Sequence, residues 1–478
     1  MPCTLRRLIS CHILALLFIL PLFLLKPNVP KLSEDPKLSE DPKLSEDPKL
    51  SEDPKLSEDP KLSEDPKLSE DPKLSEDPKL SEDPKLSEDP KLSEDPKLVV
   101  GPFVALEDNK IFIIAPYYDP RKSNLIRIVA IVHKTAKKPY CSFHCVQNGY
   151  VQVEATIDVL RENFGFVYAT ANILCPSPPQ CDYVYMSVHT NRSADLKKIP
   201  AFKIEKDLLQ SFSVNFTVCI SAIFKQYNNA MQMIQAIEMY KLLGATRITI
   251  YNTSCHENVD RVLRHYIQEG LVEVMPWPVD TYLKTSGHWK YIEGLKSEIG
   301  YFGQSAALND CMYRNMYKTE FLLLNDIDEI IFPTKYQDWP SLMESLQNRY
   351  PQTSVFRFEN HVFPTLINVT GHSRWRHVPG YDIFQYLYKE PGDALAMKPR
   401  KMIMNPRKVI QTTIHSVLKA EGNITDVLRE DGILYHCKAK RNMKIPERDL
   451  IRDDLVLRFG IPIIPNIDEV VQKLFPQN

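Results

Sequence analysis

The stretch from Phe321 to Pro333 constrains the fold of this chain more than any other. An apolar run of strand length ends in three carboxylates, at positions 326, 328 and 329, before the chain turns apolar again. In an extended backbone, residues two apart project to the same face, so Asp326 and Asp328 can face one ligand. Neighbouring carboxylates between apolar flanks repel each other and lose hydration, and a divalent cation relieves both costs. The pattern predicts Mn²⁺ or Mg²⁺ at the end of a central strand of an α/β sheet.

Three other interpretations compete with this metal–diphosphate site. A solvated turn is disfavoured by the apolar flanks 322–324 and 330–332. A calcium loop of the EF-hand type is disfavoured because its glycine and its closing glutamate are absent. A haloacid-dehalogenase-like phosphatase also ends a strand in Asp-x-Asp, and Ile330 matches its usual pattern only in part. The last alternative stays open, with Asp326 as the nucleophile.

The charge of the chain is divided unevenly. Residues 31–96 are eleven copies of Lys-Leu-Ser-Glu-Asp-Pro, each formally −1, whereas the whole chain of 478 residues has a net charge of −2. The remainder therefore carries about +9, which suits an anionic ligand such as a nucleotide but gives no reason to expect nucleic acid. The repeat has one leucine in six residues and cannot bury enough apolar surface to fold, so we expect residues 26–97 to form a disordered stalk.

The N-terminus has the features of a membrane anchor. Residues 8–25 are predominantly apolar, and Arg6 and Arg7 precede them, so the positive-inside bias places residues 1–7 in the cytosol. No small-x-small cleavage site follows, so we expect an uncleaved signal anchor with the rest of the chain in the lumen.

Sequons and cysteines agree with that compartment. Five sequons are present, at Asn191, Asn215, Asn252, Asn368 and Asn423. Eight of the ten cysteines lie beyond the anchor and allow up to four disulfides in 105 pairings. The segment from Cys175 to Cys181 has the form of a locally bridged turn.

The pattern of apolar runs divides the lumenal part in two. From residue 98 to 209, short strand-like runs separated by proline, asparagine and glycine predict a small β-rich domain. From residue 210 to 478, strands alternate with helices, which predicts a doubly wound, mostly parallel α/β sheet. The strands are expected at 214–223, 247–251, 271–275, 354–358 and 400–404, and the helices at 229–243, 259–267 and 304–317.

Two later strand-like runs each end at a histidine, His415 and His436. Imidazole is an acceptable ligand for Mn²⁺, so either could complete the metal site. A single histidine on such a run is more often structural. We favour His415 as the ligand because it follows the nucleotide-binding half, and we leave His436 open.

Several motifs in order resemble glycosyltransferase family 92, whose nematode-type members are β-1,4-galactosyltransferases acting on fucose of N-glycan cores. They lie at 219–224, 237–244, 248–251, 266–270, 309–311 and 324–329. The resemblance covers roughly residues 212 to 437. It implies a GT-A fold, a UDP-sugar donor, Mn²⁺, an inverting mechanism, and a single-pass type II protein of the Golgi membrane. Family members often carry His-Tyr-Arg near the C-terminus, where this chain has His-Cys-Lys at 436–438.

Roles for individual residues follow from that resemblance as hypotheses. Asp326 and Asp328 would hold the metal on the diphosphate of UDP-galactose. Lys401 or Arg314 would contact phosphate, and Asn252, which follows the second strand, would reach the nucleoside.

Inversion also needs a general base on the acceptor hydroxyl, for which Glu359 is the first candidate and Asp382 the second. The acceptor would be a glycan or glycoprotein. The remaining alternative is a non-catalytic lumenal protein that binds a glycan or nucleotide.

Overall fold

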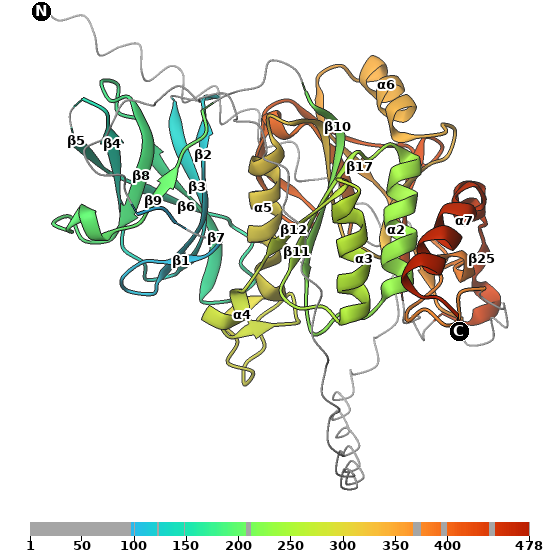
Figure 1. Cartoon of the computed structure of the whole chain (residues 1–478). Helices are drawn as coiled ribbons and strands as arrows, with labels where there is room; N and C mark the ends of the chain where they lie inside the picture. The colour runs from blue at the N-terminus through green and yellow to red at the C-terminus, as the bar shows by residue number, and fades with distance from the viewer. Residues whose placement is uncertain are drawn as a thin grey trace, which may run out of the picture. The chain divides into compact units, whose positions relative to one another are not determined.

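The site-bearing half of the chain is organised by one seven-stranded mixed sheet, seen in the computed structural model of Figure 1. The structure describes residues 97–99, 101–121, 124–147, 149–206, 212–366, 374–392, 399–438 and 445–477. Across the sheet, the strands are β12 (Val272–Pro276), β11 (Arg247–Asn252), β10 (Val214–Ile223), β15 (Thr319–Asn325), β20 (Lys401–Met404), β17 (Thr353–Phe358) and β23 (Asn423–Asp426). Four of the six pairings are parallel and both pairings of β20 are antiparallel, which confirms a mostly parallel sheet.

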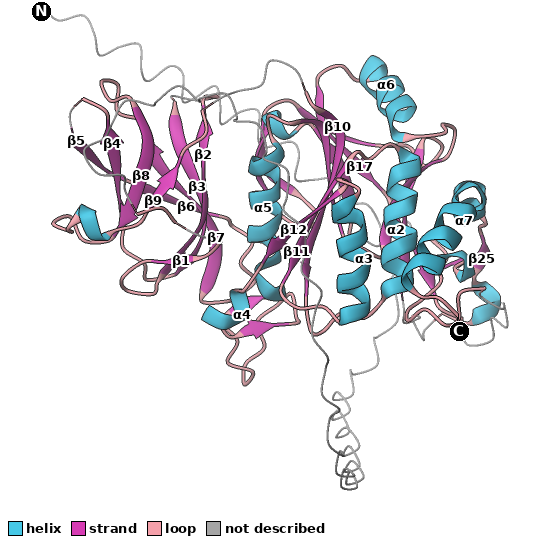
Figure 2. Cartoon of the chain, viewed as in Figure 1, coloured by secondary structure: helices cyan, strands magenta, loops and turns pink. Residues whose placement is uncertain are grey.

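Helices cover both faces of this sheet (Figure 2). The helices of this part of the chain are α2 (Ala230–Leu243), α3 (Glu257–Gln268), α4 (Val279–Tyr282), α5 (Gln304–Asn315), α6 (Trp339–Arg349) and α7 (Leu455–Leu474), of which α7 lies against α2. Apolar residues of α2, α3, α6 and α7 share one core with one face of the sheet. Residues of α5 share a second core with the opposite face and with the β-rich part. The predicted double winding is therefore present.

The bounds of α2 show why local signals suffice for some elements. Asn229 precedes the helix and accepts a hydrogen bond from the Gln232 amide at 3.2 Å, so it satisfies one of the unpaired donors of the first turn. Gly244 ends the helix in the left-handed region, at φ 107°, where a side chain would be strained. The sequence leaves Asn228 and Asn229 open as the cap, and the structure selects Asn229; the end at Gly244 lies where the sequence predicts it.

The β-rich part consists of two antiparallel sheets. One contains β1 (Val104–Ala105), β2 (Ile111–Asp119), β3 (Leu125–His133), β7 (Tyr168–Pro176) and β6 (Thr156–Val159). The other contains β5 (Gly149–Glu154), β4 (Tyr140–Cys145), β8 (Tyr183–His189) and β9 (Ala201–Lys203). The sequence analysis does not predict β1, β4, β6 or β9. The described residues belong to one compact unit, so the change of architecture near residue 210 is not a break in packing.

Disulfides correct one prediction from the sequence. Cys175 does not pair with Cys181: the bonds are Cys141–Cys175, which joins β4 to β7 in the other sheet, and Cys145–Cys181, which joins β4 to the loop before β8. Packing in three dimensions, not closeness along the chain, brings these sulfur atoms together.

In the central sheet, a third disulfide joins Cys219 on β10 to Cys311 on α5. Cys255 and Cys437 are free thiols, so the described part of the chain has three disulfides and not four.

Smaller sheets complete the fold. They are β16 (Glu329–Pro333), β24 (Gly432–Lys438) and β18 (Asn360–Pro364); β21 (Val409–Thr412) and β22 (Val417–Ala420); β13 (Thr285–Ser286) and β14 (Ile299–Gly300); and β19 (Tyr388–Lys389) and β25 (Ile451–Arg452). No helix within the described ranges is long and apolar enough to cross a membrane. The predicted anchor at 8–25 and the predicted stalk lie outside the described residues, apart from Lys97.

Candidate active site

A cavity of about 600 Å³ opens at the carboxyl ends of β10 and β15. These strands are neighbours, but the chain leaves β10 toward β11 on one side and returns to β15 on the other. Such a reversal of strand order is where open α/β sheets bind ligands. The polar lining includes Ser221, Tyr227, Asn229, Gln232, Tyr301, Gln304, Asp326, Asp328, Glu329, Asn360, Tyr381, His415 and His436.

The carboxylates reach this cavity because the chain bends sharply after β15. Asn325 ends the strand, and the Glu329 amide donates to the Asp326 carbonyl at 3.1 Å before β16 begins. The Asn325 side chain stays buried and donates to the Tyr240 hydroxyl at 2.9 Å and to the Glu329 carbonyl. The turn therefore presents Asp326 and Asp328 at the cavity wall, although through a bend in the chain and not through the extended backbone expected from the sequence.

A buried lysine neutralises one of these carboxylates. Lys401 Nζ lies 2.7 Å from Asp326 Oδ2 and 2.9 Å from Glu329 Oε2, and its side chain is 1% exposed. Asp326 Oδ1 also accepts from Gln304 Nε2 at 2.9 Å and from Ser221 Oγ at 3.3 Å. Burial alone would raise the pKa of Asp326, but the Lys401 ammonium outweighs it and holds that pKa below its usual range.

Glu329 has the opposite electrostatic balance. Burial raises its pKa to about 7 despite Lys401, and the nearby Asp326 and Asp328 charges add to that rise. Glu329 thus shares the lysine with Asp326 at the back of the cavity and contacts His436 Nδ1 at 3.4 Å through Oε1.

Asp328 lies next to a histidine on the cavity lining. Its Oδ2 lies 3.4 Å from His436 Nε2, and both side chains are partly exposed. Burial alone would lower the pKa of His436, but the hydrogen bond to Asp328 and the neighbouring carboxylates raise it. His415 lines the same cavity, and burial and Lys401 lower its pKa to about 4. His415 Nδ1 lies 3.3 Å from the Arg400 carbonyl; as an N–H donor there, it leaves Nε2 as an acceptor.

These donors fit a divalent cation that takes only some of its ligands from the protein and the rest from a substrate and water. Within the described ranges, no three His, Cys, Asp or Glu side chains are grouped as a ready-made metal site. A carboxylate and an imidazole, Asp328 and His436, nevertheless offer two adjacent donors of the types that suit Mn²⁺. Mg²⁺-type sites commonly use one or two protein ligands and complete the shell with phosphate oxygens and water. Asp326, already bound by Lys401, is less available as a direct ligand than the sequence predicts.

Both predicted general bases lie away from the cavity lining. Glu359 forms a two-pronged ion pair with Arg429, at 2.6 and 2.7 Å. Asp382 is buried, accepts from Gln235 Nε2 at 2.8 Å and caps a short helical turn at the Phe384 amide. Both carboxylates have structural partners, so the geometry gives neither a route to an acceptor hydroxyl in this cavity.

The predicted donor-binding residues are also dispersed. Arg314 is on α5, paired with the buried Asp310 at 3.0 Å, and it lines a different cavity. Asn252 ends β11 as expected, but it lies outside the cavity lining and donates to Cys255 Sγ at 3.3 Å. Lys401 is in the site, yet its ammonium contacts carboxylates instead of facing the open cavity.

Sequence reasoning missed two groups that hold Asp326 in place, Ser221 and Gln304. Ser221 lies within the buried run of β10. A polar side chain is unexpected there, and this was the signal in the sequence that could have identified it. Gln304 begins α5 directly after Gly303, and its amide contacts both Ser221 Oγ and Asp326 Oδ1. No local pattern distinguishes that glutamine from any other at a helix start.

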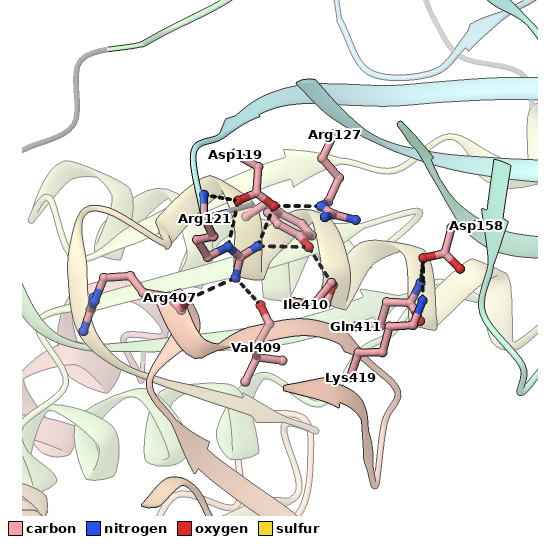
Figure 3. Close-up of polar contacts among 10 residues, drawn as sticks. Asp119, Arg121, Arg127, Asp158, Arg407, Val409, Ile410, Gln411 and Lys419 are labelled. Carbon is pink, nitrogen blue, oxygen red and sulfur yellow. Dashed lines mark hydrogen bonds and ion pairs between the residues drawn. The ribbon is translucent and has the colours of Figure 1, made fainter. Parts of the chain in front are cut away.

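The β-rich part holds the segment that carries His415 (Figure 3). Arg121, fixed by Asp119 at 2.8 Å, donates to the Arg407 and Val409 carbonyls at 3.2 and 2.6 Å. Asp158 accepts from Gln411 and Lys419, on β21 and β22, at 2.8 and 2.7 Å. The β-rich part therefore supports the hairpin that carries His415, a residue of the cavity lining.

Comparison with known proteins decides the family. The model of glycosyltransferase family 92 matches residues 214–457, just over half of the chain. The chain belongs to glycosyltransferase family 92. The match confirms the resemblance inferred from the motifs, and it covers the central sheet and all the carboxylates of the cavity. It leaves the phosphatase alternative without support.

Similar proteins come from Caenorhabditis elegans. A β-1,4-galactosyltransferase, galt-1, is 21% identical over 239 residues, covering 47% of this chain and 52% of that protein. The family 92 protein F13G3.3 is 24% identical over 198 residues, covering 41% of this chain and 37% of that protein. The chain thus spans about half or less of the length of these relatives.

Solved structures resemble this family 92 member only slightly. The structure of S. aureus TarS 1–349 in complex with UDP-GlcNAc is 12% identical, with a TM-score of 0.27, and it covers 54% of this chain and 71% of that chain.

Proposed function

We propose that the chain is a metal-dependent, inverting glycosyltransferase with a GT-A fold that moves galactose from UDP-galactose to a glycan acceptor. Fucose of N-glycan cores is the proposed acceptor sugar. The observation that carries the proposal is the pair Asp328 and His436, placed 3.4 Å apart in a large cavity at the strand-order reversal of a family 92 sheet.

The reaction forms one bond and breaks one. An acceptor hydroxyl oxygen attacks the anomeric carbon, the bond from that carbon to the diphosphate oxygen breaks, and UDP leaves with the bonding electrons. Asp328 and His436 would hold Mn²⁺ or Mg²⁺, which neutralises charge on the leaving diphosphate when bound. Lys401 keeps the Asp326 carboxylate compensated, and Ser221 and Gln304 fix its orientation.

The hydroxyl proton must pass to a base in the same cavity. His415 lines it, and its lowered pKa keeps the imidazole neutral near pH 7. It can serve as the third metal ligand predicted from the sequence or as this proton acceptor. His415→Asn separates the roles: loss of a ligand weakens Mn²⁺ affinity, whereas loss of a base lowers turnover at unchanged Mn²⁺ affinity.

We also propose that residues 8–25 anchor the protein in the Golgi membrane with the catalytic part in the lumen. The three disulfides support this proposal because such bonds persist in oxidising compartments.

The test measures UDP release by the full chain in mild detergent, across a panel of UDP-sugars, with N-glycan acceptors and with Mn²⁺ or EDTA. UDP-galactose should be the preferred donor, and EDTA should stop the reaction. Asp328→Asn should lower the rate at least about 100-fold. Asp280→Asn, an exposed carboxylate on α4, is the matched control and should change nothing.

Release of UDP that survives both EDTA and Asp328→Asn would refute the metal role. The absence of release from every donor would refute the transferase.

A further inference from the structure

A groove lies beside the cavity, between the β-rich part and the first turn of α5 with the segment before it. We name it the aromatic groove; its lining includes Asn163, Phe164, Phe166, Trp289, Tyr301 and Gln304. Tyr301, Gln304 and Ile414 line both the groove and the cavity, so the two are continuous. A ligand lying in the groove would reach the cavity beside the Gln304 amide, which contacts Asp326.

Two aromatic side chains in the groove are exposed. Trp289 is 56% exposed and Phe164 is 38% exposed, and their rings meet edge to face with centroids 5.5 Å apart. Large apolar rings next to a cavity leave surface in water that a ligand can cover. The flat face of an indole suits the C–H face of a pyranose ring, because it offers large contact area at little cost in side-chain entropy.

The backbone fixes this arrangement before any ligand binds. The Tyr291 amide donates to the Phe164 carbonyl at 3.0 Å, which ties the loop of Trp289 to the β-rich part. Phe164 and Tyr301 have φ values of 51° and 41°, in the left-handed region that bulky residues rarely adopt. Such conformations persist where the surrounding structure enforces them, and they cluster at binding sites.

Polar groups line the groove together with these rings. Asn163, Gln304, Ser305 and Thr170 also line the groove and supply amide and hydroxyl groups. Glu162 joins them and accepts from Ser416 Oγ at 3.2 Å. A saccharide presents hydroxyl edges and apolar faces together, and this mixture matches it better than it matches a purely apolar helix or acyl chain.

We propose that the aromatic groove binds the oligosaccharide acceptor. The sugar that receives the transfer would lie in the cavity, and the next residues of the glycan would stack on Trp289 and Phe164. This inference rests on the proposed function, because it assigns an acceptor to the same site. Residues of the β-rich part would then contact the acceptor and help to determine which acceptor binds.

The test is binding of the full chain, with UDP and Mn²⁺ present, to a printed array of N-glycans, O-glycans and glycolipid-type oligosaccharides, followed by titration of the best ligand found. Trp289→Ala should weaken that ligand at least about tenfold, and Phe164→Ala should weaken it less. Tyr150→Ala removes an aromatic ring of similar exposure, 46%, on β5 and should have no effect. Urea unfolding midpoints show whether each variant folds.

The outcomes separate this inference from the proposed function. Retention of no oligosaccharide, or equal retention by wild type and Trp289→Ala, overturns the acceptor groove. If the wild-type chain binds no UDP but does bind a glycan, and the Trp289→Ala variant loses that glycan binding, the donor assignment is refuted and the groove is supported.

Discussion

Replacing Lys401 tests the charge balance of the cavity. Lys401→Met keeps most of the side-chain volume but removes the ammonium that lies 2.7 Å from Asp326 and 2.9 Å from Glu329. Lys401 and Glu329 are 1% and 2% exposed, whereas Asp326 is 33% exposed and retains solvent. Removing one partner of a buried pair costs about 3–5 kcal/mol, because the other charge stays buried without compensation. We expect a loss at or below the lower end of that range, because Glu329, whose pKa is already raised to about 7, can take up a proton once the ammonium is removed.

The assay is urea unfolding of the full chain and its variants at pH 7.5. The double variant Lys401→Met with Glu329→Gln should recover at least half of the loss, because the buried carboxylate is removed with its partner. Lys419→Met is the matched control: Lys419 lies 2.7 Å from Asp158, but it is 48% exposed. Exposed pairs contribute roughly 0–1 kcal/mol, so this control should lie within that range.

Two results would refute the reasoning about Lys401. One is a loss no larger than that of the Lys419 control, which would mean that solvent already screens the site. The other is a double variant no more stable than Lys401→Met, which would assign the loss to packing of the methylene chain and not to charge.

Two further predictions concern stability. His144 and His189 are buried against Ser187 and Ser142, and burial lowers the pKa of both, so the native state disfavours their protonation. The stability that this contributes should be full above about pH 6.5 and fall below it, so the urea midpoint should be lower at pH 5 than at pH 7. The double variant His144→Gln with His189→Gln should show a smaller difference between the two midpoints. The double variant Cys219→Ala with Cys311→Ala removes a disulfide that spans 92 residues, and it should lower the free energy of unfolding by about 4 kcal/mol in the same assay. A change under 1 kcal/mol would contradict the view that this bond stabilises the native state by restricting the unfolded chain.

Local signals in the sequence predict much of the central sheet. Asn229 and Gly244 mark the ends of α2, and the run before Asp326 marks β15, because capping and strand periodicity act within a few residues. α7 is a helix that no such signal marks. Pro462 and Pro465 lie inside it, and the helix forms because its apolar face packs on the core of α2.

Partnerships across the fold could not be predicted in this way. Glu359 and Arg314 have suitable chemistry for the roles expected of them, but Arg429 and Asp310 pair with them. Lys401 was expected to contact phosphate, and instead it lies against carboxylates because β20 runs antiparallel beside β15. The pairing of charged side chains depends on the order of the strands in the sheet, and no single stretch of residues determines that order.

The shared packing around α5 has a consequence for engineering. Phe112, Val129 and Ile131 of the β-rich part lie in the same core as Met312 of α5 and Met404 of β20. A truncated chain that begins at residue 214, where the family match starts, would lose these apolar contacts to α5. It would also lose Arg121 and Asp158, which hold the β21–β22 hairpin that carries His415. Chimaeras that exchange acceptor preference between relatives should therefore move the two parts together, with the crossover placed before residue 98.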